Sequence, residues 1–213
     1  MGRKRANTRE HLLRTALGLV AREGVTRLTL EAVAAEAGVS KGGLLYHFRT
    51  KRDLIAGMVD YLGSQIDAAL ARHLAEDETR GLAGSVSRAY LETMAEPGAQ
   101  GRRPALLGGG LLAAIASDPT LLEPLRERYT AWQIRLIANG LPPPVATAIR
   151  LAADGLWFAE LFGFAPPTAD LRDQVLAYLV GLSTITGEDP HRADGGREVP
   201  PNGGPSSALD GSG

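Results

Sequence analysis

Residues 29–48 read TLEAVAAEAGVSKGGLLYHF, a helix start, a glycine turn and a second helix start in close succession. Thr29 is placed to cap the first helix, because a threonine oxygen can accept a bond from a free backbone amide there. Gly38 allows a tight turn, and Ser40 is placed to cap a short helix over residues 41–48. This order predicts a helix-turn-helix unit, whose second helix enters the major groove of DNA.

The short helix has a packing side and a side suited to DNA. Leu44 and Phe48 share the packing side at helical spacing, with the two glycines and Tyr46 opposite. Glycines there let another surface approach the backbone, and helix N-termini attract phosphate. A purely structural alternative is that the glycines relieve crowding and that Tyr46 is a half-buried aromatic residue. The predicted DNA contacts are Thr29, Ser40, Lys41, Gly42, Gly43, Tyr46, His47 and Lys51.

The charge is unevenly distributed along the chain. Residues 1–60 hold 11 Lys or Arg against 6 Asp or Glu, which gives +5; the remainder holds 12 against 18, which gives −6. A basic first segment on an acidic remainder indicates a polyanion as partner, although a solvated charged surface is the plainer alternative. The absence of cysteine excludes disulfides and thiolate chemistry and is compatible with the cytoplasm.

The composition predicts an all-α fold, because Ala, Leu, Arg and Glu dominate and β-branched and aromatic residues are sparse. No apolar run approaches the ~20 residues of a membrane span, and no secretory signal is expected. We expect a DNA-binding domain over 1–50, a helical effector and dimerisation domain over 51–186, and a disordered Gly- and Pro-rich tail over 187–213. A flexible basic arm over 1–7 precedes the first helix. The expected helices after the DNA-reading helix cover about 51–75, 80–96, 105–117, 119–139, 143–163 and 168–186.

The segment 8–54 resembles the N-terminal domain of the TetR family of regulators. The resemblance rests on Gly24, Leu28-Thr29-Leu30, Ala37-Gly38-Val39-Ser40-Lys41-Gly42, Leu44, Tyr46-His47-Phe48 and Lys51. It implies a three-helix DNA-binding head, a larger helical body with a ligand cavity, homodimerisation and a double-stranded DNA operator. One position departs from the family, which usually places a phosphate-contacting tyrosine where this chain has Leu45.

The central helices supply a candidate ligand site in this body. Their large side chains read most simply as plain core, but the resemblance implies a cavity for a small apolar or amphipathic ligand. Gln133, Arg135 and Asp154 are possible polar members of such a site. The candidate lining residues are Tyr90, Met94, Leu112, Ile115, Tyr129, Trp132, Trp157, Phe158 and Phe162.

The last two expected helices supply a candidate dimer interface. Both carry apolar residues at helical spacing, and two such helices from each subunit would form a four-helix interface. Dimerisation would place two recognition helices about one DNA turn apart. The predicted interface residues are Ile149, Leu156, Leu171, Val175, Tyr178, Leu179 and Leu182.

No pattern of enzyme chemistry was found. The four histidines have no metal-ligand spacing, and the glycines at 108–110 lack the features of a phosphate loop. We therefore expect no catalytic residue, metal or cofactor. The predicted function is a cytoplasmic transcriptional repressor that a small molecule releases from its operator. The alternatives are a ligand-independent or activating regulator, or a helical interaction module without DNA binding.

Overall fold

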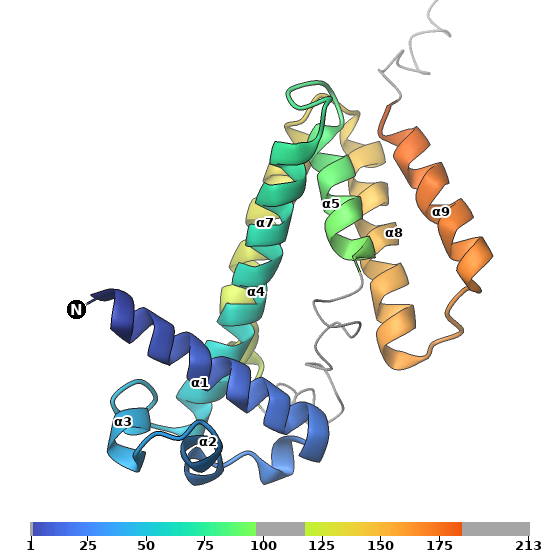
Figure 1. The fold of residues 1–213 in the computed structure, drawn as a ribbon. Coiled ribbons are helices and arrows are strands. Elements are labelled where there is room, and N and C mark those ends of the chain that lie inside the picture. The colour runs from blue at the N-terminus through green and yellow to red at the C-terminus, as the bar shows by residue number, and fades with distance from the viewer. Residues whose placement is uncertain (1, 97–117, 185–213) are drawn as a thin grey trace, which may run out of the picture.

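The structure is a computed structural model that describes residues 2–96 and 118–184. These residues are helical and contain no strand, which confirms the predicted all-α class. Figure 1 shows the first helices of the chain forming a head at one end of a larger helical body. The elements are α1 (Gly2–Glu23), η1 (Val25–Arg27), α2 (Leu30–Glu36), α3 (Lys41–Leu45), α4 (Lys51–Glu76), α5 (Ser85–Ala95), η2 (Pro119–Leu122), α7 (Glu123–Ile137), α8 (Pro143–Phe162) and α9 (Ala169–Leu182).

The helix starts predicted in the head carry their capping bonds. Thr29 Oγ1 accepts a hydrogen bond from the Ala32 amide at 3.0 Å, and Ser40 Oγ accepts one from the Gly43 amide at 3.0 Å. Gly38, between α2 and α3, has a φ of 66°, which favours glycine. The local sequence therefore sets the angle at which the chain enters α3.

Several boundaries differ from the prediction. The helix α1 begins at Gly2, so the expected flexible arm is wrong: Arg, Lys and Ala favour helix, and positive charge alone does not end one. The helix α3 ends at Leu45, which is shorter than expected. The helix expected over 119–139 begins instead as the 3-10 turn η2 before α7. The helix expected over 105–117 and the tail from 187 lie outside the described residues.

The head core is built from α1, α2, α3 and the first part of α4. Leu44 and Phe48 face inward, as predicted. The start of α4 carries a capping box between Thr50 and Asp53. The same core includes residues from α4 and η2, so the head does not end where α4 begins. These additional members are Leu54, Ile55, Met58, Val59 and Leu121.

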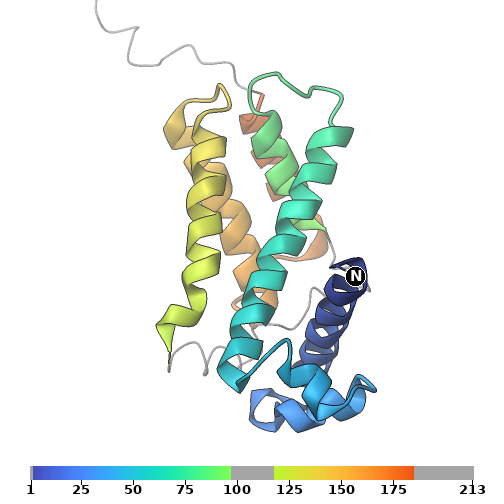
Figure 2. The ribbon, with the colours of Figure 1, turned by 90° about the vertical axis from the view of Figure 1, so that its left-hand side faces the viewer.

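The body core lies among α4, α5, α7 and α8 (Figure 2), and α9 packs outside against α5 and α8 (Figure 1). The largest fully buried side chains of the body core are Tyr90, Trp132 and Leu136, with Leu70 of α4 and Leu91 of α5. Leu125 of α7 packs against both the head core and the body core. None of the helices in the described ranges has the length and apolar character that a membrane span requires.

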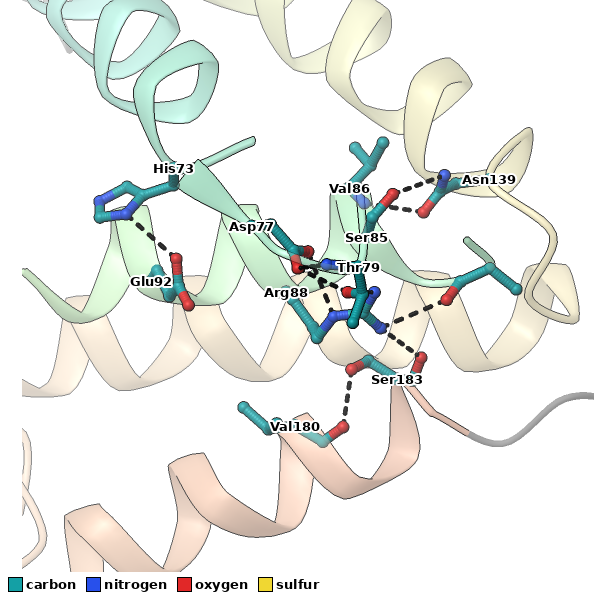
Figure 3. Close-up of polar contacts among 11 residues, drawn as sticks. His73, Asp77, Thr79, Ser85, Val86, Arg88, Glu92, Asn139, Val180 and Ser183 are labelled. Atoms are coloured by element: carbon teal, nitrogen blue, oxygen red, sulfur yellow. Dashed lines mark hydrogen bonds and ion pairs between the residues drawn. The ribbon is translucent and has the colours of Figure 1, made fainter. Parts of the chain in front are cut away.

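Arg88 joins three elements (Figure 3) at the end of the body far from the head (Figure 1). Its Nε donates to Asp77 Oδ2 at 3.3 Å, and its Nη1 donates to the carbonyl of Ser183 at 3.1 Å, just past the end of α9. Asn139, in the turn between α7 and α8, accepts from the amides of Gly84 and Val86 at 2.9 and 2.7 Å. The turn before α5 is therefore fixed to the ends of α7 and α9.

A second arginine repeats this arrangement at the opposite end of α9. Arg172 Nη2 donates to the carbonyl of Ala95, the last residue of α5, at 2.8 Å, and Arg172 Nε donates to Glu160 of α8 at 2.6 Å. The helices α5 and α9 thus each carry an arginine that satisfies a carbonyl at the C-terminal end of the other. Such cations also interact favourably with the helix dipole.

Gly84 tests how closely α9 approaches this junction. A Cβ at Gly84 would overlap the Ser183 carbonyl, whereas a Cβ at Gly81 would meet nothing within 4 Å. Both glycines have positive φ, so Gly81→Ala is the matched control for backbone strain. We expect Gly84→Ala to lower the free energy of unfolding by about 3 kcal/mol and Gly81→Ala by about 1 kcal/mol. If urea unfolding gave equal losses of unfolding free energy for the two variants, the close approach of the Ser183 carbonyl to Gly84 would be contradicted.

Candidate DNA-binding and ligand-binding sites

The outer face of α3 carries the predicted DNA contacts on a small exposed surface. Lys41, Gly42 and Gly43 are exposed, and Tyr46 is 60% exposed at the end of the helix. A Cβ atom at Gly42 would meet nothing within 4 Å, whereas a Cβ atom at Gly43 would lie 3.3 Å from Ser40 Oγ. A second molecule can therefore approach the α3 backbone most closely at Gly42.

Lys41 is engaged with a carboxylate on the neighbouring helix. Its Nζ lies 2.7 Å from Glu31 Oε1, and this hydrogen bond lowers the pKa of the Glu31 carboxyl group. Both side chains are exposed, so the pair contributes little to stability. This ion pair therefore engages a lysine that belongs to the predicted DNA-binding surface. Nine residues lie between Glu31 and Lys41 in the chain, and the two are on different helices, so the sequence gave no signal of this pairing.

The other predicted contacts surround α3. Lys51 Nζ donates to the Val25 carbonyl at 3.1 Å, which ties the start of α4 to η1 and leaves two of its three donors for a phosphate. Thr29 and Ser40 use their hydroxyl oxygens as caps, so each hydroxyl hydrogen can still be donated. Tyr46 and His47 stack edge to face at 5.1 Å. Leu45, at the position of the usual family tyrosine, is half-buried.

The structure divides the predicted ligand-site residues into two groups. Tyr90, Tyr129 and Trp132 lie together, with the Trp132 ring centroid 6.2 Å from Tyr90 and 4.9 Å from Tyr129, and Met94 belongs to the same core. A separate row of aromatic rings lies along the last turns of α8 and just beyond the helix. Its members are Trp157, Phe158, Phe162 and Phe164. The predicted Leu112 and Ile115 lie outside the described residues.

A polar network enters the first group from α7 and α8. Tyr90 Oη donates to Asp154 Oδ1 at 2.6 Å, and burial raises the pKa of both groups. Arg150 Nη1 donates to Asp154 Oδ2 at 2.8 Å, and Arg150 Nε donates to Gln133 Oε1 at 2.5 Å. Sequence reasoning named Asp154 and Gln133 but missed Arg150, although its position one helical turn before Asp154 was a usable signal. Arg135 is exposed and outside this network.

A shallow hollow of about 300 Å³ opens to solvent beside this network, lined by Tyr129, Thr130, Gln133, Ile134 and Arg150. Burial also raises the pKa of the Tyr129 hydroxyl to about 12. In the described part of the chain no three His, Asp or Glu side chains gather as a metal site. The hollow lies between α7 and α8, next to the buried polar network.

The predicted dimer face needs correction at two positions. Ile149 is fully buried and Leu179 is 6% exposed, and both pack into the chain's own body core. Leu156, Val175 and Leu182 are partly buried, whereas Leu171 and Tyr178 are 50% and 68% exposed. The exposed large apolar residues on α8 and α9 that the interface prediction omitted are Leu151, Phe158 and Val180.

Comparison with known proteins agrees with this geometry. Residues 12–58 match the model of bacterial regulatory proteins of the tetR family, and residues 84–184 match that of a tetracyclin repressor-like C-terminal domain. The chain belongs to the TetR family. The TetR assignment confirms the resemblance seen in the sequence.

Individual TetR proteins match over different lengths. The HTH-type transcriptional regulator AcrR of Shigella flexneri is 37% identical over 59 residues, which cover 28% of this chain and only about a quarter (27%) of AcrR. A TetR structure from Streptomyces coelicolor A3 superposes with a TM-score of 0.59 at 26% identity, over 81% of this chain and 97% of that chain. The multidrug binding protein EbrR with ethidium gives a TM-score of 0.60 at 23% identity, over 84% and 99% of the chains, and shares the fold.

Two substitutions on opposite faces of α3 test which face meets DNA. We expect Gly42→Leu to abolish binding to DNA sequences that have been selected with the purified wild-type protein. The free energy of unfolding should change by less than about 1 kcal/mol, because the new side chain points into open space. Leu44→Ala should instead lower the free energy of unfolding by about 2–5 kcal/mol, because Leu44 is fully buried. Anisotropy titrations and urea unfolding measure the two effects. Wild-type DNA affinity in Gly42→Leu would refute the assignment of this face.

Proposed function

We propose that this protein is a homodimeric, sequence-specific DNA-binding repressor that a small apolar or amphipathic molecule releases from its operator. The observation that carries the proposal is a hydrogen bond of 2.7 Å from Trp132 Nε1 to Asp67 Oδ1. It joins the aromatic cluster of the body to α4, the helix that continues into the head core. EbrR, solved with ethidium and with malachite green, supports a ligand in a body of this fold. We assign the protein to the cytoplasm, with no catalytic role or cofactor.

We propose that α3 reads the operator. Lys41 supplies a long donor that can reach a guanine edge, and Gly42 with Gly43 lets the backbone come close. Tyr46, His47, Lys51, Thr29 and Ser40 surround this surface and supply donors for phosphate oxygens.

Arg128 fixes α7 along α4 beside the tryptophan. Its Nη2 lies 2.8 Å from Asp60 Oδ1, and its Nη1 pairs with Asp67. Between these two aspartates Gly63 leaves the space that Arg128 occupies, because a Cβ there would overlap the arginine side chain. Asp67 therefore receives hydrogen bonds from two residues of α7, and any shift of Trp132 bears on α4 directly.

A second set of contacts couples η2 to the start of α4. Arg52 Nε donates to Asp118 Oδ2 and Arg52 Nη2 to Thr120 Oγ1, both at 2.7 Å. Leu121, next in the chain, is part of the head core. We place the junction of head and body within α4, some two turns later than residue 50, on the strength of this packing.

We propose that a ligand entering the hollow beside Tyr129 shifts the Trp132 ring, whose centroid lies 4.9 Å from that of Tyr129, and so changes the bond from Trp132 to Asp67. This change alters how α7 lies on α4, and a tilt of α4 changes the separation of the two recognition helices in a dimer. A coupling of about 1–3 kcal/mol corresponds to roughly 5–150-fold weaker operator binding.

The operator-release experiment tests this function. Small apolar and amphipathic molecules that raise the melting temperature are titrated into the protein bound to its selected DNA, and we expect a loss of affinity within about 5–150-fold. The Asp67→Asn variant should still bind both ligand and DNA, but the ligand should weaken its operator binding less than in the wild-type protein. The reason is that the variant lacks the carboxylate shared by Trp132 and Arg128. Glu76→Gln, an exposed carboxylate at the far end of α4, is the control. Ligands that bind yet leave operator affinity unchanged would favour the ligand-independent alternative.

The exposed apolar residues of α8 and α9 support homodimerisation through this face. Tyr178→Arg should give monomers, because the charge would be buried between subunits, and should weaken operator binding by about 10²-fold through the loss of bivalent contact. Leu82→Arg, at a similarly exposed leucine in the turn between α4 and α5, is the control. Sedimentation velocity measures the oligomeric state. A monomeric wild-type protein at micromolar concentration, or a dimeric Tyr178→Arg variant, would contradict this interface.

A further inference from the structure

The body core contains a carboxylate surrounded by aromatic rings. Asp154, on α8, is only 8% exposed. Tyr90 donates its hydroxyl to one carboxylate oxygen, and Tyr129 and Trp132 extend the aromatic wall beside it. A buried carboxylate is costly unless a cation or several donors compensate it, and aromatic faces attract cations as well.

The compensating cation is Arg150, one helical turn before Asp154. Its guanidinium pairs with the second carboxylate oxygen at 2.8 Å, and its central carbon lies 6.0 Å from the centre of the Tyr129 ring. Gln133 accepts a further bond from this guanidinium, and the Gln133 amide nitrogen donates to Thr147 Oγ1 at 2.7 Å. The amide is thereby oriented with its oxygen toward the cation. A planar cation is thus held by a carboxylate, an aromatic face and an amide oxygen.

Arg150 also lines the solvent-open hollow between α7 and α8, so its side chain stands between the carboxylate and that hollow. We propose that the Asp154 carboxylate and the Tyr129 ring form a binding site for a planar organic cation, and that the Arg150 guanidinium occupies this site until such a ligand displaces it. The inference rests on the proposed ligand site of the body and names the class of ligand that it takes.

Of the ion pair between Arg150 and Asp154, only Arg150 can move its charged group out of the core. Arg150 has a long, flexible side chain at the edge of the hollow and reaches water by rotating outward. Asp154 has a short side chain held by Tyr90 and stays buried. A cation that replaces Arg150 therefore leaves the carboxylate paired. An anion that drew Arg150 outward would leave the buried carboxylate without its cation, which is strongly unfavourable.

Two dyes with the same xanthene ring separate these possibilities. Rhodamine 123 is a planar cation and fluorescein is an anion at pH 7.5, and fluorescence titration of the full chain measures both without DNA. We expect the wild-type protein to bind rhodamine 123 at least tenfold more tightly than fluorescein. Arg150→Gln should bind rhodamine 123 at least fivefold more tightly than wild type, because the internal competitor is removed.

The double variant Asp154→Asn/Arg150→Gln removes both charges and so leaves no buried ion unpaired. It should bind rhodamine 123 at least tenfold more weakly than Arg150→Gln, with thermal melts as the check on folding. Equal rhodamine binding by these two variants, weaker binding by Arg150→Gln than by wild type, or a wild-type preference for fluorescein would each overturn the proposal. Rhodamine binding that follows this pattern but leaves operator affinity unchanged would instead count against the proposed function alone.

Discussion

Helix α4 belongs to both hydrophobic cores, and this sharing constrains how the rest of the molecule can work. Its first part places Leu54 and Met58 in the head core, and its second half places Leu70 in the body core. A helix of 26 residues is about 39 Å long and moves largely as one body. The head therefore cannot turn independently of the body, and a small rotation at one end of α4 becomes a displacement at the other.

The packing of α9 follows a different principle. Its buried contribution is small, with Leu179 in the core and Val175 and Leu182 partly covered, and polar contacts from Arg88 and Arg172 hold its two ends. Ends fixed in this way set the position of the helix without covering its outer side. A helix positioned by its ends can thus present an apolar face to a second subunit.

The sequence predicted the head well because its signals act over few residues. The caps at Thr29, Ser40 and Thr50 each bond three residues onward, so their geometry depends little on the rest of the fold. Helical spacing alone was less informative on α8 and α9, where one apolar face meets the chain's own core and another is exposed. Periodicity identifies such faces but not their partners, and this is why Ile149 and Leu179 were assigned to the wrong side.

The same limit applies to the ligand site. The sequence assigned the aromatic residues of the central helices to one site, whereas the structure separates the group around Trp132 from the group that includes Trp157 and Phe162. What distinguishes the group around Trp132 is the polar network of Asp154, Arg150 and Gln133, and only tertiary packing shows that these side chains bond to one another beside the rings. An ion pair buried in a protein core often stabilises it no more than apolar residues of the same volume would. Asp154 and Arg150 are therefore poorly explained as stabilising elements of the body. Their position, between a solvent-open hollow and the tryptophan that bonds to α4, is what the proposed ligand site requires, because its charge would be available to a ligand and its occupancy would bear on α4.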